Sequence, residues 1–243
     1  FYIFRNSKPI IFFSAIMLIL CDILIFISGE RSAFFFLILF SFLLIIYSSN
    51  WKIRIATIFA SILLIIVLSI FNQNIRDRML YKTIYQTQVF SENPKIFSIQ
   101  HQVIYTSAYR IFKDNYLTGI GPKLFREECK KPKYQVFTEL DGSINGCQTH
   151  PHNTYIQLLA ETGIIGTIPV VCFLLLVLYF LINQLFYMTF KKKKIYTDSE
   201  ICFLIAILIS LWPLIPTGNF FNNWLNIISI FPLGIYLYVK KIN

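Results

Sequence analysis

Two of the three histidines of the chain stand in one short motif, His150-Pro151-His152-Asn153. Pro151 suits the first turn of a helix, where its missing N–H costs nothing, with Thr149 or His150 as the cap. His152 would then lie beside unpaired backbone N–H groups, which attract anions and disfavour a protonated imidazole. A neutral histidine at an anion site can act as a general base. The motif therefore predicts proton transfer beside an anionic substrate, with His152 as the base.

Other interpretations of this motif stay open. The His-x-His spacing could supply two ligands to a metal ion, but no third ligand stands nearby and His101 is distant in the sequence. Either histidine of the motif could instead be a hydrogen-bonding group at a polar–apolar boundary. Glu161, further along the same predicted helix, could simply face water. The spacing alone does not decide between these roles.

Two arginines could hold an anionic substrate beside that base. Arg31 lies between two apolar runs, where an unpaired guanidinium is costly and is a functional candidate by default. It could equally form a solvated turn with Glu30. Arg110 is by itself a solvated charge, and gains interest only if the fold brings it together with Arg31 and His152.

The elements that must position these residues are mostly apolar. Of 243 residues, 56% are hydrophobic and 14% are charged, and the mean hydropathy is +0.62. Soluble domains carry about 25% charged residues, and disorder requires low hydrophobicity, so the composition excludes both classes. The net charge of +10 fits Lys and Arg gathered at membrane edges, in contact with lipids. We therefore expect membrane lipids as partners and no nucleic acid.

Six apolar runs predict an all-α, polytopic membrane protein with about six transmembrane helices. These runs are Pro9–Ser28, Ser32–Ser48, Arg54–Phe71, Ile164–Phe190, Ile201–Pro216 and Trp224–Val239. The fifth run is short and contains two prolines, so it is either a tilted span or one arm of a re-entrant hairpin. The predicted organisation is three spans in residues 1–71, one large loop that carries the site in residues 72–153, and three spans in residues 154–243.

Basic residues set the orientation of these spans. Alternation of the spans brings four basic clusters to one side, namely Arg5 with Lys8, Lys52 with Arg54, Lys191–Lys194, and Lys240 with Lys241. Positive charge stays cytoplasmic, so the large loop lies outside. The only ionisable residue deep inside a span is Asp22, which we expect to find a polar partner within the helix bundle. The chain begins at Phe1 without Met, which predicts the C-terminal part of a longer protein.

The large external loop is predicted to be partly helical. Residues Gln100–Lys113 space their apolar side chains as a helix does, and Pro122 suits the first position of a second helix, Lys123–Lys130. Cys129 and Cys147 lie 18 residues apart in this loop. In an oxidising compartment they can form a disulfide that holds the segment before the histidine motif against the second helix, and free thiols are the alternative.

Together these motifs resemble the O-antigen ligase family, whose superfamily also holds O-antigen polymerases and O-oligosaccharyltransferases. Three pieces carry the likeness, in the family's order: Ser28-Gly29-Glu30-Arg31-Ser32 after a span, Arg110 ahead of the Gly-x-Gly turn in Asn115–Pro122, and His152-Asn153 followed after nine residues by Gly163-x-x-Gly166. The likeness covers nearly the whole chain. Family members carry more spans, which agrees with the prediction of a longer protein.

The resemblance implies a GT-C-type glycosyltransferase of the bacterial inner membrane with a periplasmic active site. It would move a glycan from undecaprenyl diphosphate to a lipid A–core hydroxyl, with inversion and without metal or other cofactor. By this resemblance Arg31, Arg110 and His152 are catalytic, and the substrate-binding residues are His150, Asn153, Glu161 and Glu30. A polymerase or a protein O-oligosaccharyltransferase would use the same donor. A non-enzymatic scaffold or a transporter segment is the remaining alternative, although a transporter would place more ionisable groups near the midplane than Asp22 alone.

Overall fold

The computed structural model describes residues 8–87, 97–137 and 145–242, and this part of the chain is helical. Its only pairing of extended backbone is an isolated bridge between Phe137 and Asn145. By length and apolarity, three of its helices could cross a membrane: α1 (Lys8–Ser28), α3 (Trp51–Phe71) and α8 (Thr154–Phe190). A fourth, α2 (Arg31–Tyr47), is apolar but has only 17 residues. The all-α prediction is confirmed, whereas the count of six spans and the large external loop stay predictions.

The chain folds into two compact units. The first, here named the helical unit, comprises Phe1–Thr83, Val177–Ser210 and Phe231–Asn243, and the second, the site unit, comprises Ile84–Leu176 and Leu211–Ile230. Helix α8 and helix α10 (Asn223–Ile242) contribute residues to both. The predicted division into residues 1–71, 72–153 and 154–243 stays a prediction, and Arg5 of the first basic cluster lies outside the described residues.

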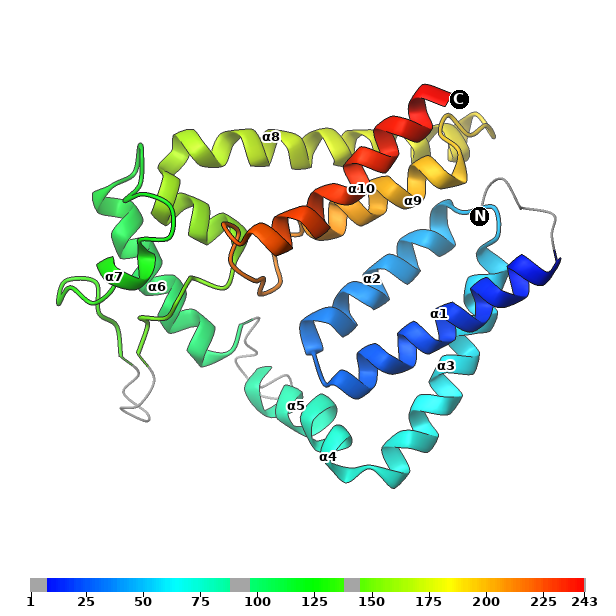
Figure 1. Cartoon of the computed structure of the whole chain (residues 1–243), viewed down its shortest axis with the longest axis horizontal. Coiled ribbons are helices and arrows are strands. Elements are labelled where there is room, and N and C mark those ends of the chain that lie inside the picture. Colours follow the sequence, from blue (N-terminus) through cyan, green and yellow to red (C-terminus); the bar gives the residue numbers. More distant parts are fainter. Residues whose placement is uncertain (1–7, 88–96, 138–144, 243) are drawn as a thin grey trace. The chain divides into compact units, whose positions relative to one another are not determined.

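Helices α1, α2 and α3 of the helical unit pack side by side around a buried ion pair (Figure 1). Arg54 on α3 donates from Nη1 and Nη2 to the two carboxylate oxygens of Asp22 on α1, at 3.0 and 2.9 Å. Its Nε donates to Ser41 on α2 at 3.1 Å, and Ser61 on α3 donates to Asp22 at 2.8 Å. The expected partner of Asp22 is thus present. The assignment of Arg54 to the basic membrane edge is wrong, because its side chain is buried in the bundle.

Two turns meet at one end of the helical unit. Lys194 Nζ donates to the carbonyl of Tyr47 at 2.7 Å and to Asp198 at 2.6 Å, and the N–H of Ser49 donates to Asp198 at 3.0 Å. The turn after α2 therefore lies beside the basic run after α8, which is the arrangement that alternating spans predict. Asp198 is also the first residue of α9 (Asp198–Ser210), which packs against α2.

The helical boundaries differ from the predicted runs at two places. After α3 the chain continues through α4 (Gln73–Arg76), a π-helix η1 (Asp77–Tyr81) and α5 (Lys82–Thr87), where the sequence predicted a loop. Helix α9 ends at Ser210, short of the predicted end at residue 216, because the residue before Pro213 is biased away from helical backbone. Residues 211–222 are not helical and belong to the site unit.

The site unit is built on α6 (Ile99–Asp114), α7 (Phe125–Glu128) and the first turns of α8. Its core consists of Ile104, Ala108, Ile111, Phe125, Cys129, Tyr134 and Ala160. Helix α6 confirms the predicted helix within one residue at each end. Helix α7 is a single turn, and the predicted start at Pro122 is wrong because Lys123 has a left-handed φ of +65° that a right-handed helix cannot contain.

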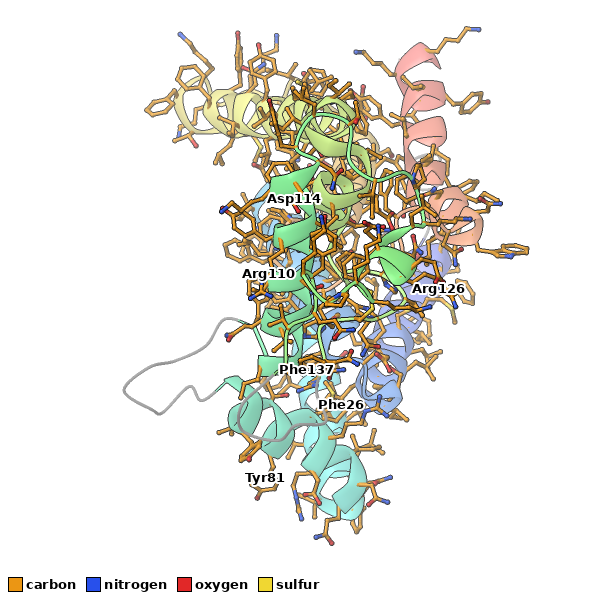
Figure 2. The ribbon with its side chains drawn as sticks, turned by 90° about the vertical axis from the view of Figure 1, so that its left-hand side faces the viewer. Phe26, Tyr81, Arg110, Asp114, Arg126 and Phe137 are labelled. Atoms are coloured by element: carbon orange, nitrogen blue, oxygen red, sulfur yellow. A yellow bond between two sulfur atoms is a disulfide. The ribbon has the colours of Figure 1, made fainter. Side chains whose placement is uncertain are left out.

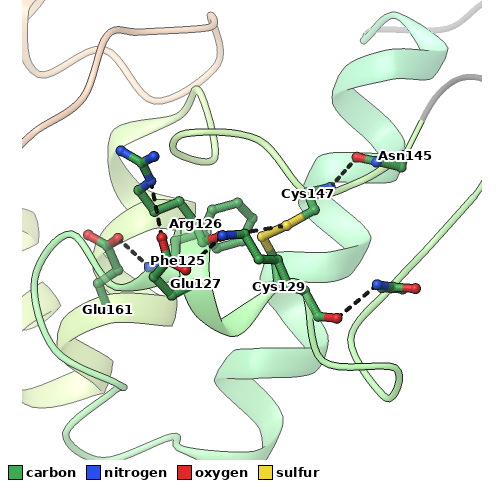
Figure 3. Close-up of a disulfide and its surroundings, with 9 residues drawn as sticks. Phe125, Arg126, Glu127, Cys129, Asn145, Cys147 and Glu161 are labelled. Atoms are coloured by element: carbon green, nitrogen blue, oxygen red, sulfur yellow. Dashed lines mark hydrogen bonds and ion pairs between the residues drawn. A yellow bond between two sulfur atoms is a disulfide. The ribbon is translucent and has the colours of Figure 1, made fainter.

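A disulfide joins Cys129, at the end of α7, to Cys147 (Figure 3). Their Cα atoms lie 5.2 Å apart, within the usual range for a disulfide. Cys129 is fully buried in the core of the site unit, and Cys147 packs against that core. The bridge therefore fixes the segment before the histidine motif to the core of the site unit.

Candidate active site

Helix α8 begins only after the histidine motif, and Asn153 caps it. Asn153 Oδ1 accepts hydrogen bonds from the N–H groups of Tyr155 and Ile156 at 3.1 and 3.2 Å, as a strong N-cap residue does. Its Nδ2 donates to the carbonyl of Pro213 at 2.7 Å. The predicted start at Pro151, with one of the two preceding residues as the cap, is therefore wrong. The histidines precede the first turn of the helix and do not lie in it.

The backbone of His152 is held in an unusual conformation. Its φ is +57°, in the left-handed region that costs free energy for a residue other than glycine. The carbonyl of His152 accepts from the N–H of Thr217 at 2.8 Å, and the hydroxyl of Thr217 pairs with that of Thr154 at 3.1 Å. Residues 211–222, whose first part the sequence assigned to the fifth apolar run, thus hold the motif in place.

All three histidines of the chain gather at this point. The ring centroids of His150 and His152 are 4.0 Å apart, and that of His101 is 5.9 Å from that of His152 in a nearly perpendicular arrangement. His101 lies in the first turn of α6, with Nδ1 at 2.8 Å from the hydroxyl of Ser98. His101 is thus close to the motif in space, although its distance in the sequence counted against it as a third metal ligand. Even so, within residues 8–87, 97–137 and 145–242 no three His, Cys, Asp or Glu side chains are placed to hold a metal ion.

Burial keeps the two motif histidines neutral. Burial, together with the neighbouring His152, lowers the pKa of His150 from 6.5 to about 4. Burial also lowers the pKa of His152. At neutral pH both rings can therefore accept a proton. The structure favours the neutral imidazole that the sequence predicts, but the cause is desolvation and not the predicted helix start.

Glu161 is fully buried and both of its oxygens are bonded within the chain. Oε1 accepts from the N–H of Phe125 at 3.0 Å (Figure 3), and Oε2 accepts from Gln157 Nε2 at 2.9 Å. Gln157 Nε2 also donates to Asn219 Oδ1 at 2.8 Å. Glu161 therefore does not face water. Its carboxylate links α8 to α7 directly, and to residues 211–222 through Gln157.

Arg110 is not placed beside the histidines. It lies on α6 nine residues after His101, so the two side chains leave opposite faces of the helix about 13.5 Å apart along its axis. Figure 2 shows Arg110 and Asp114 on α6. The guanidinium is exposed and donates from Nη1 to the carbonyl of Gln135 at 2.9 Å. Any contact with a substrate at His152 would require this bond to be exchanged.

Arg31 and Glu30 belong to the helical unit and are both exposed. Glu30 pairs with Arg78 and not with its neighbour Arg31: Oε1 of Glu30 accepts from Nη2 of Arg78 at 3.0 Å. The Arg78 side chain also lies against Gly29, whose φ of +69° forms the turn between α1 and α2. Among the ion pairs of the described residues, none involves Arg31. Arg78 comes from the π-helix η1, which the sequence did not predict.

Helix α8 is broken at Gly163, whose φ of +63° and ψ of −165° are not helical. Residues 116–121 pair with the backbone groups on both sides of the break. Four bonds do this: Ile120 N–H to Ala160 O at 3.2 Å, Gly121 N–H to Glu161 O at 2.8 Å, Ile164 N–H to Tyr116 O at 2.9 Å, and Ile165 N–H to Leu117 O at 3.2 Å. In an unbroken helix these groups of α8 would bond to each other. The break therefore lies at the first glycine of Gly163-x-x-Gly166, and Figure 1 shows the bend in α8.

Comparison with known protein families matches residues 14–171 to the family described as O-antigen ligase. The matched range is more than half of the chain and contains every predicted site residue. The chain belongs to the O-antigen ligase family. It is therefore a member of a family of membrane glycosyltransferases of the O-antigen ligase and polymerase type. No curated protein and no solved structure matches the chain significantly.

In this O-antigen ligase family member, two motifs that are distant in the sequence contact each other through their backbones. A Cβ on Gly119 would overlap the backbone of Glu161, and a Cβ on Gly163 would overlap the carbonyl of Leu117. Both glycines also have positive φ, which other residues rarely adopt. The Gly-x-Gly turn and the glycine after His152-Asn153 are thus fixed by one backbone contact, which orients the first turns of α8 and the histidines before them.

Proposed function

We propose that this O-antigen ligase family member transfers a glycan from undecaprenyl diphosphate to a hydroxyl of lipid A–core, on the periplasmic face of the bacterial inner membrane. The observation that carries the proposal is the cluster of neutral imidazoles held before α8. His152 takes the proton of the acceptor hydroxyl as its oxygen attacks the anomeric carbon. The bond from that carbon to the diphosphate oxygen breaks on the opposite side, so the configuration inverts.

The leaving diphosphate carries concentrated negative charge, which the proposal assigns to Arg31 and Arg110. A guanidinium can bind two phosphate oxygens at once and stays charged at every relevant pH. Positive charge from two arginines supplies the stabilisation that a divalent metal supplies elsewhere, so no metal or other cofactor is required. Arg31 has its guanidinium exposed, whereas Arg110 must first leave the Gln135 carbonyl.

The remaining residues support the reacting groups. His150 stacks on His152, and Asn153 fixes the motif by capping α8 and bonding to the Pro213 carbonyl. Glu161 holds α7 to α8. Glu30, paired with Arg78, shapes the turn that presents Arg31. Each contributes to substrate binding by positioning another group.

The glycan profile of a strain that lacks the gene tests the reaction assigned here. Ligation predicts that long polymer accumulates on the lipid carrier while lipid A–core stays bare. Accumulation of single glycan units on the carrier would instead identify a polymerase, and loss of glycan from periplasmic proteins would identify a protein O-oligosaccharyltransferase. An unchanged profile of lipid-linked glycans would contradict all three reactions and favour a scaffold or a transporter segment.

Replacement of Arg31 by lysine tests how the diphosphate is held. An ammonium cannot form the bidentate fork, so we expect Arg31→Lys to lower the transfer rate about tenfold. The matched control is Arg126→Lys, at an exposed arginine already paired with Glu127, and it should leave the rate unchanged. Equal rates in both variants would show that Arg31 supplies no more than a point charge.

A further inference from the structure

Three exposed apolar side chains come from residues 116–124, the segment whose first part pairs with α8 at its break. Tyr116, Leu117 and Leu124 are 54%, 51% and 48% exposed. Single exposed apolar residues are ordinary on soluble surfaces. Here, however, the carbonyls of Tyr116 and Leu117 are bonded to the N–H groups of Ile164 and Ile165. Ile165 is itself 61% exposed, so exposed apolar side chains stand on both partners of this backbone contact.

Helix length places this surface at the level of a membrane boundary. Residues 164–190 of α8 contain no Asp, Glu, Lys or Arg, and Lys191 follows directly. These 27 residues extend about 40 Å at 1.5 Å each, which matches the hydrocarbon core with most of both interfacial regions. The charge-free stretch begins at Ile164, so the polar–apolar boundary of α8 lies there. The bonded carbonyls bring Tyr116 and Leu117 to the same level.

We infer that Tyr116, Leu117 and Leu124 form a docking surface by which the site unit inserts into the interfacial region of the lipid bilayer. Tyrosine suits this region because its ring is amphipathic. Lys123, exposed beside Leu124, can reach lipid phosphates. The surface contains none of the residues assigned to catalysis, so its occupant does not depend on the proposed function. If that function holds, the surface also fixes the height of His152 above the bilayer.

A fluorescent probe on Leu117 tests this assignment in the full-length protein. The free cysteines Cys21, Cys172 and Cys202 are replaced by serine, Leu117→Cys is labelled with an environment-sensitive dye, and the protein is reconstituted in phosphatidylethanolamine–phosphatidylglycerol vesicles. Spin-labelled lipids should quench the dye severalfold more than in the control variant, and aqueous iodide should quench it severalfold less. The control is Thr106→Cys, exposed on the face of α6 that carries Arg110 and Lys113.

The outcomes separate the possible occupants. Iodide quenching at residue 117 equal to that at residue 106 would overturn the proposal. Shielding from iodide without lipid quenching, and dependent on protein density in the vesicles, would overturn it in favour of contact with a second copy. A probe at Leu124→Cys provides an independent position in case the first variant folds poorly. Lipid quenching there, with iodide shielding, would support the proposal on its own.

Discussion

Two regions of this chain hold ionisable groups in apolar surroundings, and these groups differ between the regions in their partners and in their charge. In the helical unit, Asp22 and Arg54 meet with ideal pairing: both carboxylate oxygens and all three guanidinium nitrogens have partners within the bundle. In the site unit, His150 and His152 stack as neutral rings with lowered pKa values, on a backbone held at positive φ.

This difference distinguishes a group that is bound entirely within the fold from a group that can still take part in a reaction. A charge whose partners are all supplied by the chain has no remaining capacity for a substrate, and removal of one partner destabilises the fold because the other charge stays buried and unpaired. A buried imidazole that stays neutral retains the capacity to accept a proton, and strained backbone of this kind gathers at functional sites. Substitutions in the two regions should therefore affect different observables.

The largest effect on activity is expected for His152→Ala. Loss of a general base typically lowers a rate by about 10²–10⁴-fold, and the free energy of unfolding should change by less than about 1 kcal/mol because no buried pair is broken. The measurements are glycan transfer to lipid A–core by the full-length protein in vesicles, and unfolding in detergent. A variant that retains full transfer would remove His152 from the mechanism.

The opposite pattern is expected for Asp22→Ala. Leaving the Arg54 guanidinium buried and unpaired should lower the free energy of unfolding by about 3–5 kcal/mol, while the transfer rate per folded molecule stays unchanged. The paired variant Asp22→Leu with Arg54→Met should recover most of this loss, since it removes both charges. A paired variant as unstable as the single one would show that the loss does not come from the unpaired Arg54 charge.

An intermediate effect on both observables is expected for Gly163→Ala. Its positive φ costs about 1–3 kcal/mol for another residue, and the added Cβ would push residues 116–121 away from α8, so stability and transfer should fall together. Gly234→Ala in α10 is the matched control. Nothing lies within 4 Å of a Cβ there, and alanine favours a helix by about 1 kcal/mol over glycine. Equal behaviour of the two variants would contradict the role of the backbone contact.

Much of the fold could be predicted because periodicity and apolarity are local signals. The runs that became α1, α2, α3 and α6, the helical part of α8 after Gly163, and the run of α10 are all visible in the sequence. The end of α9 and the single turn of α7 were missed because Pro213 and the left-handed Lys123 outweigh helix-forming neighbours. The π-helix that carries Arg78 has no sequence signal comparable to a glycine or a proline.

The candidate site was predicted less completely, because its partners come from distant segments. His150, His152 and Asn153 are adjacent, so the motif was visible. His101 joins them only through the packing of α6, and Thr217 contributes a backbone N–H that no side-chain pattern reveals. Gly119 and Gly163 were visible in the sequence, but only the fold shows that each is required where the backbones of the two segments approach closely.

The most direct test of the central claim, that His152 acts as a neutral base, is the pH dependence of the transfer rate. A base with a lowered pKa stays unprotonated as the pH falls below 6.5, the ordinary histidine value, so the rate should hold there and then fall about tenfold per pH unit. Because the two rings interact, the apparent pKa belongs to the pair. We predict an acid limb with an apparent pKa below 6.5 that disappears in His152→Ala. A limb at or above 6.5, or the same limb in the residual activity of the variant, would contradict the account.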